Sequence, residues 1–173
     1  MEIRIRDNNI LPDVIVIERN VFPDPRGFNT EIYSEKDYSD KGINIKFVEQ
    51  TMSCSKKNVL RGVHGDDETW KLISCLYGEV YFVVINYNHK SKYFGRWQSF
   101  TLSPHNGLQV LVPPNYGNGH IVLTDQAVFH YNRSAYYKGL GNQFTVKWND
   151  PRFNISWPIK NPILSKRDEN VNL

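Results

Sequence analysis

Short runs of β-branched and aromatic residues recur along the whole chain and are separated by Gly, Pro, Asn and Ser. Runs of this length, bounded by turn-forming residues, predict β-strands rather than helices. The predicted strands cover residues 3–5, 14–17, 46–53, 59–63, 71–76, 80–85, 96–102, 109–112, 120–123, 127–131 and 144–148. Such a succession of strands is typical of an all-β sandwich or barrel.

Shorter segments complete the predicted fold, among them a loop at Pro23-Asp24-Pro25. Tyr77-Gly78-Glu79 is a short turn that predicts a hairpin between the strands on either side of it. Ser34-Glu35-Lys36-Asp37 fits a capping box, and Gly42 follows as a C-terminal cap, so one short helix is expected there. The tail from Asn149 contains three prolines and is expected to be irregular, with short helical turns.

Length and charge restrict the class of protein. The 173 residues suit one compact domain spanning 1–173, and no linker or repeat divides them. The net charge of +3 is too small to predict nucleic-acid binding. The longest apolar run, 80–85, is far shorter than the roughly 20 residues of a membrane helix, so no membrane partner is expected. The first residues lack the apolar core of a secretory leader, which favours a cytoplasmic protein.

His64 is the first candidate for chemistry, because it lies at a strand end beside two glycines in Val59-Leu60-Arg61-Gly62-Val63-His64-Gly65. A general base could stand there at a barrel mouth, although from this segment alone a satisfied surface or core histidine is the more ordinary explanation. Asp66 and His120 raise a metal hypothesis, since histidines and carboxylates are metal ligands. This ligand set is incomplete, and no metal is predicted.

Alternation in residues 127–131 places Ala127, Phe129 and Tyr131 on one strand face and His130 on the other. Tyr131 would then point into the barrel, as a core aromatic or as a site residue. Arg26, Arg61 and Lys71 lie in or beside apolar strands, where cations need partners. A diphosphate would suit them, and internal ion pairs with Asp24 or Glu31 are the alternative.

Read in order, several short motifs resemble the dTDP-4-dehydrorhamnose 3,5-epimerase family. They are Phe22-Pro-Asp24-Pro-Arg26-Gly27-Phe28 with Glu31, Val59-Leu60-Arg61-Gly62-Val63-His64, Lys71-Leu72, Gly78-Glu79-Val80, Phe94-Gly95-Arg96-Trp97, Leu102-Ser103, Trp148-Asn149-Asp150-Pro151, Ile155-x-Trp157-Pro158 and Leu164-Ser165-x-x-Asp168. Each motif alone is weak, but the ordered set covers the chain from about Val14 to Asp168.

The resemblance implies a cupin-type jelly-roll barrel that forms a homodimer and acts on a nucleotide-linked 4-keto sugar without a metal or cofactor. It implies that His64 is the base, that Asp168 is its carboxylate partner, and that Tyr131 donates a proton. It also implies that Tyr137 and Glu31 contact the substrate and that Arg26, Arg61 and Lys71 contact the phosphates. The chemistry agrees, because a ketone at carbon 4 acidifies the hydrogens on carbons 3 and 5, and an unperturbed histidine has a pKa of about 6.5.

Two departures from the family pattern suggest a substrate other than the rhamnose precursor. The segment between His64 and Lys71 is shortened, and the motif G-F-A-H-G-F becomes Asn115-Tyr116-Gly117-Asn118-Gly119-His120. Asn118 and His120 are therefore candidate substrate contacts. The combined pattern resembles the branch that acts on GDP-linked 4-keto heptoses in capsular polysaccharide biosynthesis.

Where the family has Phe-Val-Gln-Asp-Asn, this chain has Phe47-Val48-Glu49-Gln50-Thr51, in which Glu49 and Thr51 share a strand face. The resemblance implies that this segment contacts the base of the nucleotide. The Glu49 carboxylate could accept from the N1–H and amino group of guanine, or it could pair with a nearby Arg or Lys.

The leading prediction is an isomerase, an epimerase inverting carbon 3, or carbons 3 and 5, of a GDP-linked 4-keto heptose. The alternatives are a dTDP-4-keto-6-deoxyhexose 3,5-epimerase, a 3,4-ketoisomerase, a nucleotide-sugar-binding cupin without catalysis, and a metal-dependent oxygenase. One geometric problem stays open, because strict alternation puts Arg61 and His64 on opposite strand faces unless Gly62 forms a bulge or one of the two serves a neighbouring subunit.

Overall fold

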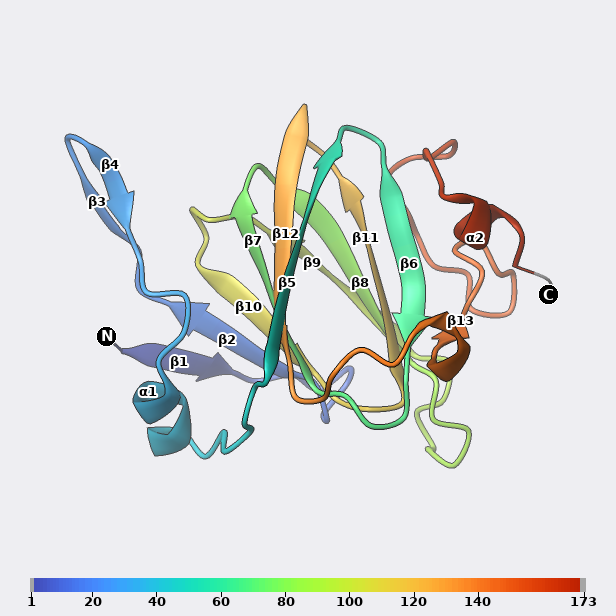
Figure 1. The fold of residues 1–173 in the computed structure, drawn as a ribbon, viewed down its shortest axis with the longest axis horizontal. Coiled ribbons are helices and arrows are strands. Elements are labelled where there is room, and N and C mark those ends of the chain that lie inside the picture. The colour runs from blue at the N-terminus through green and yellow to red at the C-terminus, as the bar shows by residue number, and fades with distance from the viewer. Residues whose placement is uncertain (1, 172–173) are drawn as a thin grey trace.

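The structure, a computed structural model, describes residues 2–171 and is built from two antiparallel sheets that face each other (Figure 1). The six-stranded sheet contains, in spatial order, β1 (Ile3–Arg6), β2 (Ile15–Arg19), β10 (Leu108–Val112), β7 (Lys71–Tyr77), β12 (Gln126–Arg133) and β5 (Glu49–Lys56). The five-stranded sheet contains β13 (Phe144–Thr145), β6 (Leu60–Gly65), β11 (Tyr116–Val122), β8 (Val80–Asn86) and β9 (Trp97–Leu102). The predicted all-β jelly roll is confirmed.

Alternation along the strands produces three apolar layers. The central layer, between the sheets, includes Ile73 and Cys75 of β7, Phe82 of β8, and Phe129 of β12. A second layer covers the outer face of the larger sheet, and a third covers the outer face of the smaller sheet with the C-terminal segment, which includes Phe153. The central layer fills only part of the space between the sheets, so one end of the barrel is left for a pocket.

The predicted helix forms as α1 (Glu35–Asp40). Ser34 caps it by accepting from the backbone N–H of Asp37, and Gly42 follows with a φ of +82°. Tyr38 of this helix is buried on the outer face of the larger sheet and donates a hydrogen bond to Gln109. The tail is irregular, as predicted, except for α2 (Lys166–Glu169), which a serine also caps. A 3₁₀ turn, η1 (Leu140–Asn142), precedes β13. Neither described α-helix has the length and apolarity needed to cross a bilayer.

Two local predictions were wrong. The turn at Gly78 does not close a hairpin, because β7 and β8 belong to different sheets. The inward faces of both strands are apolar, so the chain folds over at Gly78 and packs them against each other instead of pairing them. The Pro-containing segment expected to be a loop instead forms a two-stranded ribbon, β3 (Phe22–Asp24) and β4 (Gly27–Asn29). This ribbon projects away from the two sheets (Figure 1).

Strand β11 begins four residues earlier than predicted, through a Gly- and Asn-containing stretch that looks like a turn in the sequence. A Cβ at Gly119 would lie 3.0 Å from the carbonyl oxygen of Arg61, so β11 and β6 approach closely at this glycine. The register between these strands shifts by one residue between the pairs Asn118–His64 and His120–Arg61. Gly62 supplies the extra residue with a φ of +117°.

Candidate active site

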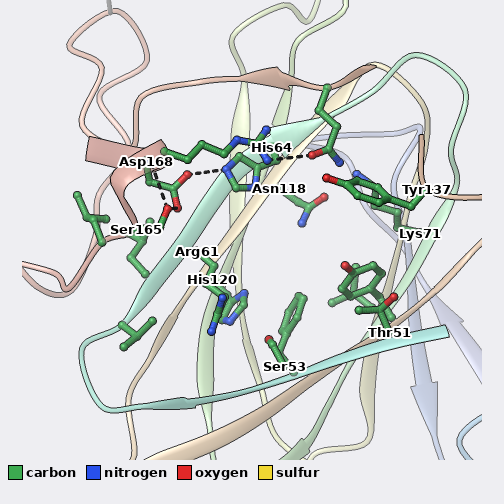
Figure 2. A pocket seen from close by; sticks show the side chains of 18 of the residues that line it. Thr51, Ser53, Arg61, His64, Lys71, Asn118, His120, Tyr137, Ser165 and Asp168 are labelled. Carbon is green, nitrogen blue, oxygen red and sulfur yellow. Dashed lines mark hydrogen bonds and ion pairs between the residues drawn. The ribbon is translucent and has the colours of Figure 1, made fainter. Parts of the chain in front are cut away.

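The bulge at Gly62 resolves the conflict between Arg61 and His64. Because β6 has one residue more than β11 at this point, both side chains face the interior and line the same pocket. The pocket is a cavity of about 610 Å³, which is within the usual size range of small-molecule sites. Strands β5, β7 and β12 form one wall, β6 and β11 form the other, and α2 lies at the edge (Figures 1 and 2).

His64 is held by Asp168 across 104 positions of sequence. Its Nε2 lies 2.6 Å from Asp168 Oδ1, and Figure 2 shows this contact beside Ser165. Ser165 caps α2 by accepting from the Asp168 N–H, and its hydroxyl donates to Asp168 Oδ2. Burial by itself would raise the pKa of Asp168, but the hydrogen bond and charge of His64 outweigh it, so this pKa is lowered. The carboxylate therefore stays ionised next to the imidazole.

Tyr131 lies on β12, in the sheet opposite His64, and lines the same pocket. Its β5 neighbour in the ladder is Thr51, which also lines the pocket. The predicted alternation holds here, since Phe129 and Tyr131 face the cavity whereas His130 is not among its lining residues. The two proposed proton-transfer groups thus approach the cavity from opposite walls.

The predicted phosphate contacts separate into two groups. Arg61 and Lys71 both line the pocket. Arg61 Nε donates to Ser55 Oγ at 2.9 Å, and Lys71 Nζ lies 3.6 Å from Asp66 Oδ2. Lys71 is 7% exposed, and burial lowers its pKa despite the opposing effect of Asp66.

Arg26 and Glu31 do not join the pocket of their own chain. Arg26 sits at the end of the β3–β4 ribbon, fully exposed and ion-paired with Asp24 at 2.6 Å. The Glu31 backbone carbonyl accepts from Arg19 Nη1, at the base of this ribbon. Within one chain, the structure does not bring these two residues to the pocket that contains His64, because the ribbon folds as a separate projection.

Glu49 and Tyr137 line the pocket, as predicted. The Glu49 carboxylate already has two partners, Arg133 Nη1 at 3.3 Å and the backbone N–H of Tyr137 at 3.0 Å. Arg133 also lies over the Tyr137 ring, 5.2 Å from its centroid. The alternative in which Glu49 pairs with a nearby cation is the arrangement found.

Five polar residues of the pocket were not among the predicted site residues: Ser53, Arg133, Gln143, Ser165 and Arg167. Arg133 continues the inward alternation of β12, so extending that pattern by two residues would have found it. Arg167 donates to Gln143 Oε1 and Thr145 Oγ1, which fixes its side chain at the edge of the cavity. Arg167 directly precedes Asp168 in the motif Leu164-Ser165-x-x-Asp168, and this position was the sequence signal that could have identified it as a site residue.

Asn118 and His120, the candidate substrate contacts of the sequence, line the pocket from β11 of the smaller sheet. Asp66, the third member of the metal hypothesis, instead accepts from the Thr69 and Glu68 N–H groups and faces Lys71. Among the described residues, no group of three or more His, Cys, Asp or Glu side chains has an arrangement that could hold a metal ion.

The sequence model of the family described as dTDP-4-dehydrorhamnose 3,5-epimerase matches residues 8–173. The chain belongs to this family. One curated relative, the dTDP-4-dehydrorhamnose 3,5-epimerase of Shigella flexneri, is 37% identical over 164 residues, which cover 92% of this chain and 90% of that protein.

Solved structures of family members agree with this assignment. The dTDP-4-dehydrorhamnose 3,5-epimerase from Bacillus anthracis, with TDP and PPi bound, has a TM-score of 0.92 at 31% identity and covers 99% of both chains. The Legionella pneumophila enzyme, in complex with dTDP-4-keto-L-rhamnose, has a TM-score of 0.89 at 32% identity and covers 97% of this chain and 90% of that one. The protein is therefore an epimerase of the isomerase class.

Proposed function

We propose that this epimerase inverts carbon 3 and carbon 5 of a nucleotide-activated 4-keto sugar, with His64 as the base and Tyr131 as the opposing proton donor. The observation that carries the proposal is the His64–Asp168 contact of 2.6 Å at the wall facing Tyr131. With Nε2 bonded to the carboxylate, Nδ1 is the ring nitrogen left to accept a proton. A histidine with only a structural role would need neither a buried carboxylate partner nor a tyrosine on the opposite wall of a cavity.

The proton balance is simple. Nδ1 of His64 accepts the proton from carbon 3 or 5. The electron pair of the C–H bond stays with the substrate and forms an enolate, whose negative charge rests on the oxygen at carbon 4. Asp168 stabilises the imidazolium that forms. Tyr131 then protonates the same carbon from the opposite face, and the resulting phenolate recovers its proton from solvent while His64 loses its own. The enolate oxygen needs a donor or cation, and Lys71 or Asn118 on the pocket walls could serve. No step requires a cofactor.

A diphosphate suits the cations of the pocket. Arg61 and Lys71 are joined there by Arg133 and Arg167, whose positive charges both act on Lys71. Four cations exceed the charge of the three nearby carboxylates, Glu49, Asp66 and Asp168, so a dianionic group would reduce the mutual repulsion of the cations. The Bacillus relative, with TDP and PPi bound, supports this role for the pocket.

The dTDP-linked substrate is favoured over the GDP-linked heptose. The relatives from Shigella flexneri, Salmonella typhimurium and Escherichia coli are named dTDP-4-dehydrorhamnose 3,5-epimerases, and these names give no support to a GDP-linked substrate. The structure adds that Glu49 already accepts from Arg133 and from the backbone N–H of Tyr137, so its carboxylate is not an unpaired group waiting for guanine. A GDP-linked 4-keto heptose of a capsular pathway remains the second candidate, since Asn118 and the shortened segment between His64 and Lys71 depart from the family pattern beside the catalytic histidine.

We also propose that the active form is a homodimer. The β3–β4 ribbon carries Arg26 away from its own pocket and exposes Phe22 and Phe28 to solvent. A ribbon of this kind can complete the site of a second copy, which would restore Arg26 and Glu31 as substrate contacts. Light scattering of the purified protein should give twice the chain mass, and Arg26→Ala should weaken substrate binding without lowering that mass.

The test of the reaction is incubation with dTDP-linked and GDP-linked 4-keto sugars in D₂O, followed by NMR. Deuterium at carbons 3 and 5 is expected with the dTDP-linked hexose. Deuterium at carbon 3 alone would make the enzyme a 3-epimerase, and exchange with only the GDP-linked heptose would favour the second candidate. Movement of the carbonyl to carbon 3 would indicate a ketoisomerase, and absence of exchange with every sugar would refute the proposal.

A further inference from the structure

The β3–β4 ribbon is joined to the larger sheet by a buried polar cluster at its base. Arg19, the last residue of β2, is only 4% exposed although it carries a charge, and the proposed reaction does not use it. Its Nη1 donates to Thr30 Oγ1 at 3.3 Å and to the backbone carbonyl of Glu31 at 3.2 Å. The Thr30 hydroxyl in turn donates to the carbonyl of Asn20 at 2.9 Å. The two ends of the ribbon are therefore bonded to each other and to β2.

A second buried side chain holds the next residue of the same segment. Gln109 of β10 is 1% exposed, and its Nε2 donates to the carbonyl of Ile32 at 2.9 Å and to Ser74 Oγ at 2.6 Å. Tyr38 of α1 donates to the side-chain oxygen of Gln109. Residues 30–32, which lead from the ribbon to α1, thus receive three hydrogen bonds from side chains of the larger sheet (Figure 1).

The ribbon depends on this cluster for its direction. A two-stranded ribbon alone is marginally stable in water, and β3 and β4 pair with no further strand among residues 2–171. Beyond its base, the ribbon packs the ring of Phe28 against His105, with centroids 5.0 Å apart. Burial lowers the pKa of Arg19, so a charge is an unfavourable way to fill this space. What the guanidinium supplies, and an apolar side chain would not, is hydrogen bonds of fixed direction.

We propose that Arg19 and Gln109 are positioning residues, which hold the ribbon at the angle that carries Arg26 to the diphosphate in the pocket of a second copy of the chain. The proposal rests on the homodimer proposed above and identifies what fixes its shared site. Arg26 lies at the turn of the ribbon, and the cluster lies at the opposite end. Six residues of strand span roughly 20 Å, so a tilt of about 10° at the base would move Arg26 by about 3 Å, enough to break a hydrogen bond to phosphate.

Calorimetric binding of dTDP and GDP tests the proposal without requiring turnover. Arg19→Met preserves the length of the side chain and removes the donors to Thr30 and Glu31. We expect it to weaken binding of the preferred nucleotide about tenfold, as we expect of Arg26→Ala, while light scattering still gives the mass of a dimer. Because Arg19 acts through Arg26, the double variant should bind within about twofold of Arg26→Ala.

Thr30→Val provides a second test that leaves the buried guanidinium in place. It removes only the hydroxyl that joins Arg19 to Asn20, and it should weaken nucleotide binding about threefold. The matched control is Arg6→Met on β1. Arg6 is also an arginine of the larger sheet, but its ion pair with Glu18 is at the surface, so nucleotide binding should not change.

Mixed dimers show on which pocket Arg19 acts. Chains carrying Arg19→Met and His64→Asn are co-expressed with different affinity tags, and the dimer that carries both tags is purified. Its one catalytic histidine lies in the Arg19→Met chain, and the ribbon that reaches this pocket comes from the His64→Asn chain and is intact. We expect the Arg19→Met homodimer to have a KM for the 4-keto sugar about tenfold above that of the wild type, with little change in kcat. The mixed dimer should have the KM of the wild type.

Three results would overturn the proposal. Wild-type nucleotide affinity in both Arg19→Met and Thr30→Val would show that the ribbon does not need the cluster. A mixed dimer that keeps the raised KM would show that Arg19 acts on the pocket of its own chain. A double variant that binds much more weakly than Arg26→Ala would show that Arg19 does not act through Arg26. Failure of the wild type to bind either nucleotide would overturn the proposed function, and this proposal with it.

Discussion

Replacing Asp168 by Asn removes one negative charge from beside the catalytic histidine while preserving the shape of the side chain. Asp168 is 3% exposed and lies 2.6 Å from His64, so water cannot take the place of the carboxylate. Two unit charges about 4 Å apart, at an effective dielectric constant of about 20, attract with about 4 kcal/mol. That attraction develops only as His64 becomes an imidazolium, so its loss raises the barrier.

A barrier increase of about 4 kcal/mol corresponds to about a 10³-fold slower reaction. The assay is the first-order rate of deuterium entry at carbon 3 in D₂O, followed by NMR with saturating nucleotide sugar. We expect Asp168→Asn to slow this rate by roughly 10²- to 10³-fold, with substrate affinity changed by much less.

The matched control is Asp150→Asn. Asp150 is also a buried carboxylate, ion-paired with Arg152 at 2.5 Å, but it does not line the pocket. Its variant should exchange deuterium at the wild-type rate. A rate loss below fivefold in a folded Asp168→Asn protein, or equal losses in both variants, would refute the assigned role of Asp168.

Three further predictions address the opposing proton donor, the buried histidine and the phosphate contacts. Tyr131→Phe should reduce formation of the inverted product by at least about 100-fold while deuterium still exchanges from the His64 face, and full epimerisation by this variant in a coupled assay would contradict its role. The pKa of His120 is lowered to about 3, so the unfolded chain binds a proton there below pH 6.5 that the folded protein does not, and stability should fall with decreasing pH. Between pH 7 and 5, the free energy of unfolding of His120→Phe, measured with urea, should fall by about 1–2 kcal/mol less than that of the wild type. The same fall in both proteins would contradict the burial of a neutral histidine. Arg61→Gln should weaken nucleoside diphosphate binding about tenfold and reduce its salt dependence, and unchanged affinity in calorimetry would exclude a phosphate contact.

Much of the fold could be predicted because period-two alternation and turn residues are local signals. The helix at residues 35–40 and the inward face of Phe129 and Tyr131 followed directly from such patterns. The wrong prediction of a hairpin at Gly78 shows what local sequence signals cannot determine. A glycine turn between two apolar runs is compatible with either a hairpin or a crossing to the opposite sheet, and only the packing of both inward faces decides between them.

The site was predictable where the chemistry is carried by single residues and less so where it depends on long-range contacts. His64 and Asp168 were expected to meet only from the family resemblance, because no sequence pattern relates residues so far apart. The pairing of Glu49 with Arg133 and of Asp66 with Lys71 required the ladders of the sheet. Arg26 shows the converse, since a motif identified the residue but could not show that its ribbon leaves the pocket of its own chain.

The most direct test of the central claim is deuterium exchange by wild type and His64→Asn side by side, with a dTDP-linked 4-keto-6-deoxyhexose in D₂O. The account predicts that the wild type incorporates deuterium at carbons 3 and 5 and yields the inverted sugar, whereas His64→Asn shows no exchange above the rate without enzyme. Exchange by His64→Asn at a rate near that of the wild type would contradict the account.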